Sequence, residues 1–239
     1  MVELAFGIAG YATCGLLPDN NPEVFCTPRD GTCHDAAPRP PVPVLLRRRV
    51  TPIGRAVLRA SWALPQLEHA RFIFASRHGE FDRTLAMLEE VADDDGPSPA
   101  DFSLSVHNAL PGLLSICTRN QGGHTALAAG PDSFGFGLME AGACLIERPE
   151  EPIMLAYYDD RLPLGYPDTI PASAEASLAF ALMLVPPRQV PRHIVMAATP
   201  TAASAPDESA GAVFLRFLRT AASEASAKGE RMSWSWRHV

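Results

Sequence analysis

A run of small and apolar residues, HTALAA at 124–129, breaks at Gly130 and is followed at once by a helical pattern. The run has the composition of a strand, and apolar residues between Ser133 and Leu145 recur at helical spacing. A strand that turns tightly into a helix is typical of layered α/β folds, and many α/β enzymes hold their nucleophile at such a turn. The turn residue here is Gly130, which has no side chain that could attack a substrate.

Strand and helix patterns alternate along the rest of the chain. The sequence predicts strands at Val2–Ile8, Arg71–Ala75, Thr125–Ala129, Pro152–Tyr158 and Ala176–Val185. It predicts helices at 52–64, 81–91, 133–145 and 208–222, and one within 101–120 that is interrupted or kinked near Pro111. Thr51 is expected to cap the helix that begins at Pro52. This order predicts an α/β layered sheet that is mostly parallel with an antiparallel finish.

Composition and charge exclude several classes of protein. The chain has 239 residues, 47% of them hydrophobic, which is enough for one large domain or two small ones with an ordinary core. The net charge of -7 argues against nucleic-acid binding, which needs a clustered basic surface. No Lys or Arg precedes the apolar start, so no export signal is expected, and the apolar run Ala176–Val185 is about half of a membrane span. The sequence therefore predicts a cytoplasmic protein without a membrane span.

Five cysteines stand at positions 14, 26, 33, 117 and 144. An odd number without regular spacing fits a reducing cytoplasm better than a disulfide framework. Cys26, Cys33 and His34 lie close together in the sequence, but no CxxC pair or second ligand cluster accompanies them. We therefore expect no metal site, and we expect no cofactor.

Several segments carry a resemblance to a known family. They are ELAFGIAGYATCG at the start, SLSVHNALPGLLSICTRNQGGHTALAAG, DSFGFGLMEAGACLIE and EPIMLAYYDD. Over about residues 1–186 the chain resembles the N-terminal half of a β-ketoacyl synthase, a member of the thiolase fold. It resembles still more closely the short chain-length-factor-like proteins of aryl polyene pathways, for which SRHGEFDRTLAMLEE and SLSVHNALPGLLSI look typical.

This resemblance implies a thiolase-like fold, N-terminal half only, with a mixed five-stranded sheet and flanking helices. Residues 1–186 are then a ketosynthase N-terminal-like domain, and residues 187–239 are a linker, a C-terminal helix and an aromatic tail that packs on the same domain. A fold cut in half leaves an apolar face uncovered. Either the helix around Phe214–Leu218 and the WSW tail fold back over this face, or another chain covers it.

The catalytic groups of the family are missing from this sequence. The position of the family's catalytic cysteine falls on Gly130. The family's two histidines come after this turn, but only His193 and His238 follow it here, and neither stands in the family's sequence setting. Decarboxylative condensation needs a thiolate that holds the acyl chain and histidines that stabilise the developing carbonyl anion. The resemblance therefore implies no catalytic residue.

By this resemblance the chain is a non-catalytic subunit that pairs with an active β-ketoacyl-ACP synthase. It is expected to shape the acyl tunnel of that partner in aryl polyene, polyketide or fatty-acid-type chain elongation, with acyl carrier protein as a second partner. The strand expected to pair across the dimer is Thr125, Ala126, Leu127, Ala128 and Ala129. The residues expected to contact the tunnel or the partner are Val106, His107, Asn108, Leu110, Pro111, Asp132, Ser133 and Phe134.

Two other classes of function stay open. One is a stand-alone acyl hydrolase or acyltransferase that uses Ser133, Cys117 or Cys144, although Ser133 is not framed as G-x-S-x-G. The other is a scaffold that binds acyl carrier protein without a tunnel role. The simpler interpretation of Asp132 or Ser133 is a cap of the helix that follows. The polar segment Ser76–Glu80 is either an ordinary connecting loop or a border of the partner's pocket.

Overall fold

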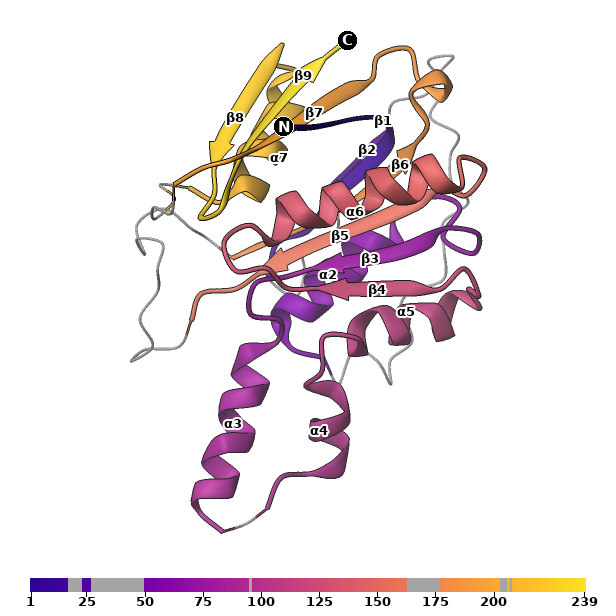
Figure 1. Ribbon diagram of the computed structural model, residues 1–239. Helices are drawn as coiled ribbons and strands as arrows, with labels where there is room; N and C mark the ends of the chain where they lie inside the picture. Colours follow the sequence, from indigo (N-terminus) through magenta and orange to yellow (C-terminus); the bar gives the residue numbers. More distant parts are fainter. Residues whose placement is uncertain (17–22, 27–49, 95, 163–176, 203–205, 207) are drawn as a thin grey trace.

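The computed structural model describes residues 1–16, 23–26, 50–94, 96–162, 177–202, 206 and 208–239. Within them the strands are β1 (Val2–Thr13), β2 (Glu23–Cys26), β3 (Arg71–Ala75), β4 (His124–Leu127), β5 (Ile153–Asp159), β6 (Leu178–Val185), β7 (Ile194–Pro200), β8 (Glu224–Lys228) and β9 (Met232–His238). The helices are α2 (Pro52–Trp62), α3 (Phe81–Ala92), α4 (Pro99–Leu104), α5 (Ala109–Thr118), α6 (Ser133–Glu147), α7 (Ala210–Thr220) and the short 3₁₀ helix η1 (Pro187–Gln189). In Figure 1, α3 and α4 form an arm that projects from the body.

The described strands form a nine-stranded sheet in the order β4-β3-β5-β6-β1-β7-β9-β8, with β2 paired to β1. β3 runs parallel to β4 and β5, and the other pairs are antiparallel. The sheet is mixed and flanked by helices as predicted, but the predictions of five strands and of mostly parallel pairing are wrong. β1 begins the chain and pairs with β6 and β7, which come late in the sequence. Pairing between such distant segments leaves no local pattern that could predict strand direction.

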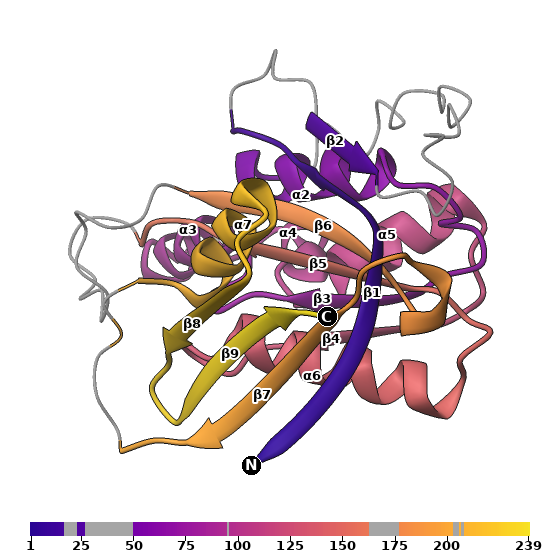
Figure 2. The same ribbon diagram turned by 90° about the horizontal axis from the view of Figure 1, so that it is seen from above.

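Side chains alternate across the central strands, so each of these strands contributes to two cores. On β3, Ile73 and Ala75 lie in the core that α6 and α7 cover, whereas Phe72 and Phe74 lie in the core that α2 and α5 cover. Figure 2 shows α2 and α6 on opposite sides of the sheet. Because both faces of these strands are buried, their sequences are almost continuously apolar, which is why β3, β5 and β6 were predictable.

The C-terminal segment covers one of these cores. Where the sequence predicts a linker, the structure has the strand β7, and β8 and β9 extend the sheet further. Trp234 and Trp236 are almost fully buried, and the ring of Phe134 on α6 lies 6.3 Å from that of Trp236 and 5.1 Å from that of Phe214 on α7. Gly135 permits this packing, because a Cβ at this position would overlap the indole of Trp234. The C-terminal helix and the aromatic tail thus fold back over an apolar face, one of the two expected outcomes.

The ends of the helices agree with the sequence in part. The Thr51 hydroxyl accepts a hydrogen bond from the Gly54 amide at 3.3 Å and caps α2 as predicted. The interruption expected within 101–120 exists, but it lies between α4 and α5, whereas Pro111 lies in the first turn of α5, where proline is tolerated. The domain division after residue 186 stays a prediction. Among the described helices, none has the length and apolar character needed to cross a membrane.

Candidate functional site

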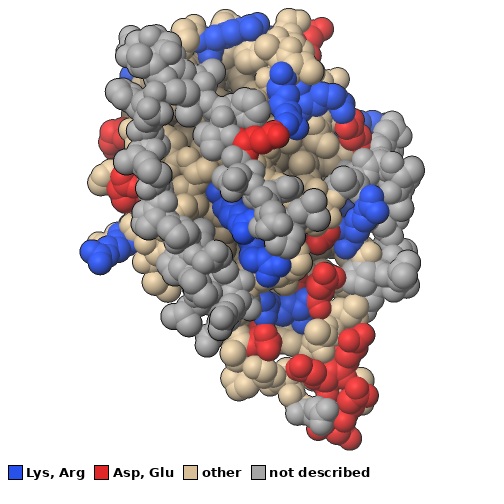
Figure 3. Space-filling view, turned by 180° about the vertical axis from the view of Figure 1, so that it is seen from behind, with Lys and Arg blue, Asp and Glu red and all other residues tan. Residues whose placement is uncertain are grey.

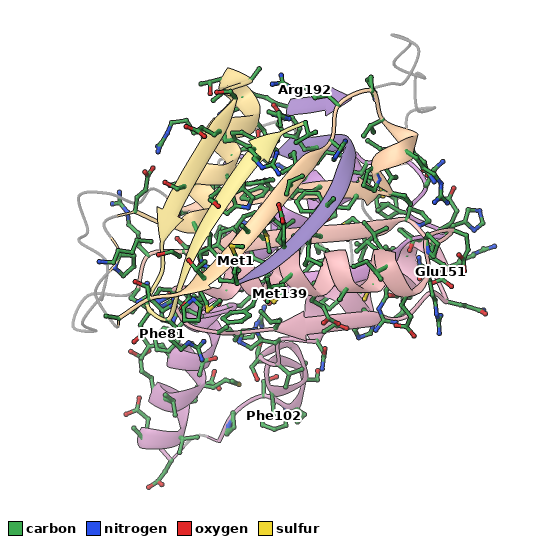
Figure 4. All side chains as sticks on the ribbon, turned by 45° about the horizontal axis from the view of Figure 1, so that its top comes forward. Met1, Phe81, Phe102, Met139, Glu151 and Arg192 are labelled. Atoms are coloured by element: carbon green, nitrogen blue, oxygen red, sulfur yellow. The ribbon has the colours of Figure 1, made fainter. Side chains whose placement is uncertain are left out.

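The carboxyl ends of β3, β4 and β5 lie together at one end of the sheet, because these three strands are parallel. Three polar segments come together there: the loop Ser76–Glu80 after β3, the turn Ala128–Asp132 after β4, and Asp159 at the end of β5. Phe81, labelled in Figure 4, is the first residue of α3, and the α3–α4 arm leaves the body at this end of the sheet. The same end contains the turn at Gly130, where the sequence has no nucleophile, and we take it as the candidate functional site.

The turn after β4 is closed by a serine hydroxyl. Gly130 has a φ of 60°, in the left-handed region that glycine adopts at little cost. The Ser133 side chain is buried, and its hydroxyl accepts a hydrogen bond from the Ala129 amide at 2.9 Å and donates one to the Gly130 carbonyl at 2.7 Å. Its proton is therefore engaged by the backbone, which opposes a role for Ser133 as a nucleophile. It closes the turn rather than capping α6, so the capping prediction is wrong for this residue.

Asp132 holds the turn to the C-terminal hairpin. Its carboxylate is fully buried and accepts hydrogen bonds from the Trp234 indole at 3.0 Å and from the Arg231 amide at 2.9 Å. The Arg231 guanidinium in turn donates to the Ala129 carbonyl at 2.9 Å. Asp132 makes no side-chain capping bond to α6, so the capping prediction is wrong here too. The hairpin between β8 and β9 thus lies directly against the Gly130 turn.

The space beside Gly130 has room for a side chain. The nearest atom to a Cβ built there is Glu230 Oε2 at 3.5 Å, an ordinary van der Waals distance. Conformation, and not lack of space, is therefore the reason that this position favours glycine.

Asp159 organises the loop that follows β3. Its carboxylate accepts hydrogen bonds from the Tyr157 hydroxyl at 2.6 Å, from the Arg77 amide at 2.7 Å and from the Ser76 hydroxyl at 3.2 Å. Burial raises the pKa of Asp159, whereas the bonds from Tyr157 and the Arg77 amide act in the opposite direction. Asp159 was not among the predicted site residues, although an acidic residue at the end of a buried strand was a signal for it. The loop after β3 is thereby a well-bonded connection, and its place at a partner's pocket stays a prediction.

The exposed tunnel candidates lie at the junction of α4 and α5. Val106 is 51% exposed, Asn108 is exposed, and His107 is half-buried. The His107 ring lies against Gly79 of the loop after β3, since a Cβ on Gly79 would lie 3.4 Å from it. Burial lowers the pKa of His107, which keeps the imidazole neutral at neutral pH. This junction is the part of the predicted set that a partner could contact.

The remaining tunnel candidates are buried, on opposite faces of the sheet. Leu110 belongs to the core under α2 and α5, and Pro111 is buried on the same helix. Phe134 is fully buried and packs in the aromatic core under α6 and α7. The predicted residues are therefore divided between an exposed junction and two separate cores.

The strand predicted to pair across the dimer lies at an edge of the sheet. β4 pairs with β3 only, so its other edge carries no strand in the described chain. Thr125, Ala126 and Leu127 are half-buried, whereas Ala128 and Ala129 belong to the turn and not to the strand. A hollow of about 470 Å³ lies beside this edge, between the turn, Met139 and Glu140 of α6, and Arg231.

The described cysteines lack the features of a nucleophile. Cys14 is buried, Cys117 and Cys144 are half-buried, and burial raises the pKa of all three thiols. An activated cysteine has a lowered pKa instead. The described residues contain no group of three side chains that could hold a metal ion. Cys33 and His34 lie outside the described residues, as does the side chain of Cys26.

A comparison with protein families decides where this chain belongs. The model of the β-ketoacyl synthase N-terminal domain matches residues 26–237. The chain is a member of this family. Among curated proteins, none matches the sequence significantly.

Solved structures share the ketosynthase fold of this chain. A chain from the complex of the ketosynthase ApeO with its chain length factor ApeC, from Xenorhabdus doucetiae, matches with a TM-score of 0.71 and 21% identity, over 99% of this chain and 97% of that chain. The ishigamide ketosynthase/chain length factor matches with a TM-score of 0.51 and 13% identity, over 72% and 55%. A β-ketoacyl synthase from Burkholderia phymatum STM815 matches with a TM-score of 0.52 and 10% identity, over 85% and 66%. The predicted thiolase-like fold is thereby confirmed.

Proposed function

We propose that this ketosynthase-family chain is a non-catalytic, chain-length-factor-like subunit that pairs with an active β-ketoacyl-ACP synthase. The observation that carries the proposal is Gly130, which stands where the family holds its catalytic cysteine, on a turn whose only hydroxyl is engaged by the backbone. The partner then performs all the covalent chemistry. The complex of ApeO with ApeC supports such a pairing, because a chain in it has this fold at nearly the same length.

The outer edge of β4 supports the pairing, because it has the features of a surface that accepts another strand. The backbone amide of Phe72 on β3 donates a hydrogen bond to the Gly123 carbonyl, and the amide of Ser76 in the loop after β3 donates one to the Leu127 carbonyl, both at 3.1 Å. In a parallel ladder every second residue of a strand directs its amide and carbonyl toward the same neighbour. Since Gly123 and Leu127 face β3, the amide and the carbonyl of Ala126 point away from it. An edge with such outward groups is a template for a further strand, and small side chains let a second chain approach closely.

We assign the tunnel contact to Val106, His107 and Asn108. Val106 and Asn108 are exposed at this junction between helices, so they can extend toward a partner without disturbing a core, and the half-buried His107 lies between them against Gly79. Leu110, Pro111 and Phe134 are buried, so changes there would act mainly on stability. With bulk at this junction, the subunit would limit how far the acyl chain extends in the partner, in a pathway of the aryl polyene or polyketide type.

The alternative functions have less support. A hydrolase that uses Ser133 conflicts with the two backbone bonds of its hydroxyl, and one that uses Cys117 or Cys144 conflicts with their raised pKa values. A scaffold without a tunnel role predicts the same complex but a product length that does not depend on Val106. Replacing Val106 by Trp in the complex separates the two, because only a tunnel contact shortens the product.

Co-expression with an active β-ketoacyl-ACP synthase, followed by size-exclusion chromatography, tests the proposal. We expect the two chains to elute together. We expect Ala126→Pro to lose the complex, because proline removes the outward amide, while Ala126→Val keeps the amide and the complex. Circular dichroism checks that both variants are folded. A chain that elutes alone, whatever the partner concentration, would refute the proposed function.

A further inference from the structure

The loop that follows β3 is tied to the body of the protein at both of its ends. At its start, the Asp159 carboxylate accepts hydrogen bonds from the Ser76 hydroxyl at 3.2 Å and from the Arg77 amide at 2.7 Å. At its end, the buried Glu80 carboxylate accepts a hydrogen bond at 2.9 Å from the amide of Thr51, the residue that caps α2. A loop bonded in this way to the ends of two buried elements opens less readily than a free loop.

The Ser76 hydroxyl connects Asp159 to Gly79. This buried hydroxyl donates to the carboxylate and also accepts a hydrogen bond from the Gly79 amide at 2.8 Å. The His107 ring lies against Gly79, since its Cε1 and Nε2 atoms would each be 3.4 Å from a Cβ at this position. A continuous series of contacts therefore runs from Asp159 to the ring of His107.

The α3–α4 arm gives the His107 junction little support. Both helices of the arm are fully described, and neither has a buried residue. Figure 3 shows acidic side chains gathered on the projecting end of the arm, as suits a segment that faces water. His107 lies between α4 and α5, and α5 buries Ala109 and Leu110 directly after the junction. The junction is thus held to the body by α5 on one side and by the loop after β3 on the other.

We infer that Asp159 is a positioning residue for the tunnel contact, because it fixes the loop against which His107 lies and so determines where Val106 and Asn108 are held. This inference rests on the proposed function, which gives the junction its tunnel role. A carbon–carbon bond is about 1.5 Å long, so a shift of the junction by two bond lengths is enough to admit or exclude one two-carbon unit of an acyl chain. Small displacements of the loop therefore change the product.

Two substitutions of Asp159 separate its hydrogen bonds from its charge. Asp159→Ala removes the acceptor of both loop bonds. In Asp159→Asn the amide oxygen can still accept from Ser76 and Arg77, and the amide nitrogen takes the place of the oxygen that faces the Tyr157 hydroxyl. That hydroxyl can then turn its proton toward the Ser209 hydroxyl, 3.3 Å away. Both variants lose the negative charge, but only Asp159→Ala loses the loop bonds.

The His107 ring reports the position of the loop in the isolated chain. Burial lowers the pKa of His107, so a loop that moves away exposes the ring, and the pKa rises toward 6.5. Loss of a nearby negative charge acts in the opposite direction, and it does so in both variants. NMR of isotopically labelled histidine follows this titration, and the signal is assigned by its loss in His107→Gln. We expect the pKa of His107 to rise in Asp159→Ala and not in Asp159→Asn.

Asp160→Ala is the matched control, and Ser76→Ala is a second test. The Asp160 carboxylate accepts from the Arg161 amide at 2.8 Å and from the Ser177 hydroxyl instead, so its removal should leave the pKa of His107 without a rise. Ser76→Ala keeps the charge of Asp159 and removes the acceptor of the Gly79 amide. We expect it to raise the pKa of His107 as Asp159→Ala does. Circular dichroism checks that each variant is folded.

Product length in the complex with an active β-ketoacyl-ACP synthase is the second measurement. We expect Asp159→Ala and Ser76→Ala to lower severalfold the fraction of product that has the length made with the unmodified chain. Asp159→Asn and Asp160→Ala should keep that fraction. An unchanged pKa of His107 in both Asp159→Ala and Ser76→Ala, or an unchanged product in a complex that still forms, overturns the inference while the pairing stands. If even the unmodified chain forms no complex, the proposed function fails, and the titration of His107 alone decides whether Asp159 positions the ring.

Discussion

A cysteine introduced at the turn after β4 tests whether this chain can acquire condensing activity. In Gly130→Cys the new Cβ meets no atom closer than Glu230 Oε2 at 3.5 Å, so the cost comes from a φ of 60°. That conformation costs an ordinary residue about 1–2 kcal/mol. In a protein of this size about 1 kcal/mol lowers Tm by about 2–4 °C, so we expect a loss of about 2–8 °C. Gly130→Ala should lose as much, and Gly130→Asn less, because asparagine tolerates this region.

We expect no condensation by the isolated Gly130→Cys chain. The imidazole of His238 is stacked on Phe217 with 4.6 Å between ring centroids, and the His193 amide donates to the Val239 carbonyl. Both histidines lie at the far end of β9 from Arg231, which contacts the turn. A strand of this length spans about 20 Å. No imidazole from this part of the chain can therefore stabilise a carbonyl anion at the turn.

Two assays check this prediction. Turnover is measured with acyl and malonyl thioesters and the purified variant alone, and alkylation of the introduced thiol by iodoacetamide is followed against pH. In the Gly130→Cys background, Glu230→Gln should lower the pKa of the thiol by about half a unit to one unit, because it removes a nearby carboxylate. Condensation by the isolated variant would refute the reasoning about catalysis. An unchanged Tm for Gly130→Ala would refute the reasoning about strain.

Two further predictions concern packing and pH. Gly135→Ala should lower the free energy of unfolding by about 1–3 kcal/mol, because the new Cβ overlaps the indole of Trp234. Gly112→Ala should raise the free energy of unfolding by about 0.5–1 kcal/mol, because a Cβ there has no atom within 4 Å and alanine favours a helix. Urea unfolding compares the two variants. His107 has a lowered pKa when folded, so its neutral form stabilises the protein above the unfolded pKa and this contribution is lost as pH falls below about 6.5. His107→Gln should therefore lose less stability than the unmodified chain between pH 7 and pH 5, and equal losses would contradict this.

The elements buried on both faces were predictable from the sequence, and the roles of the turn residues were not. The strand Arg71–Ala75 has the same bounds in the sequence prediction and in the structure. A short apolar run between polar residues is typical of a buried strand, because it is too short for a helix. Asp132 before a helix suggests a cap, since that is its usual local use. Its hydrogen-bond partners, Arg231 and Trp234, lie about a hundred residues later, where no local pattern points back to it.

The sequence by itself determined that this chain has strands and helices in the order of a ketosynthase N-terminal domain, and that the turn between the strand at 124–127 and the helix from Ser133 carries a glycine, Gly130, which has no side chain to act as a nucleophile. These properties depend on residue identity and on spacing within short segments. Only the tertiary structure decided that β4 lies at an edge, that Phe134 and Leu110 belong to opposite cores, and that the C-terminal tail holds the turn. Each of these depends on which distant segments meet, and that is determined by the packing of the whole chain.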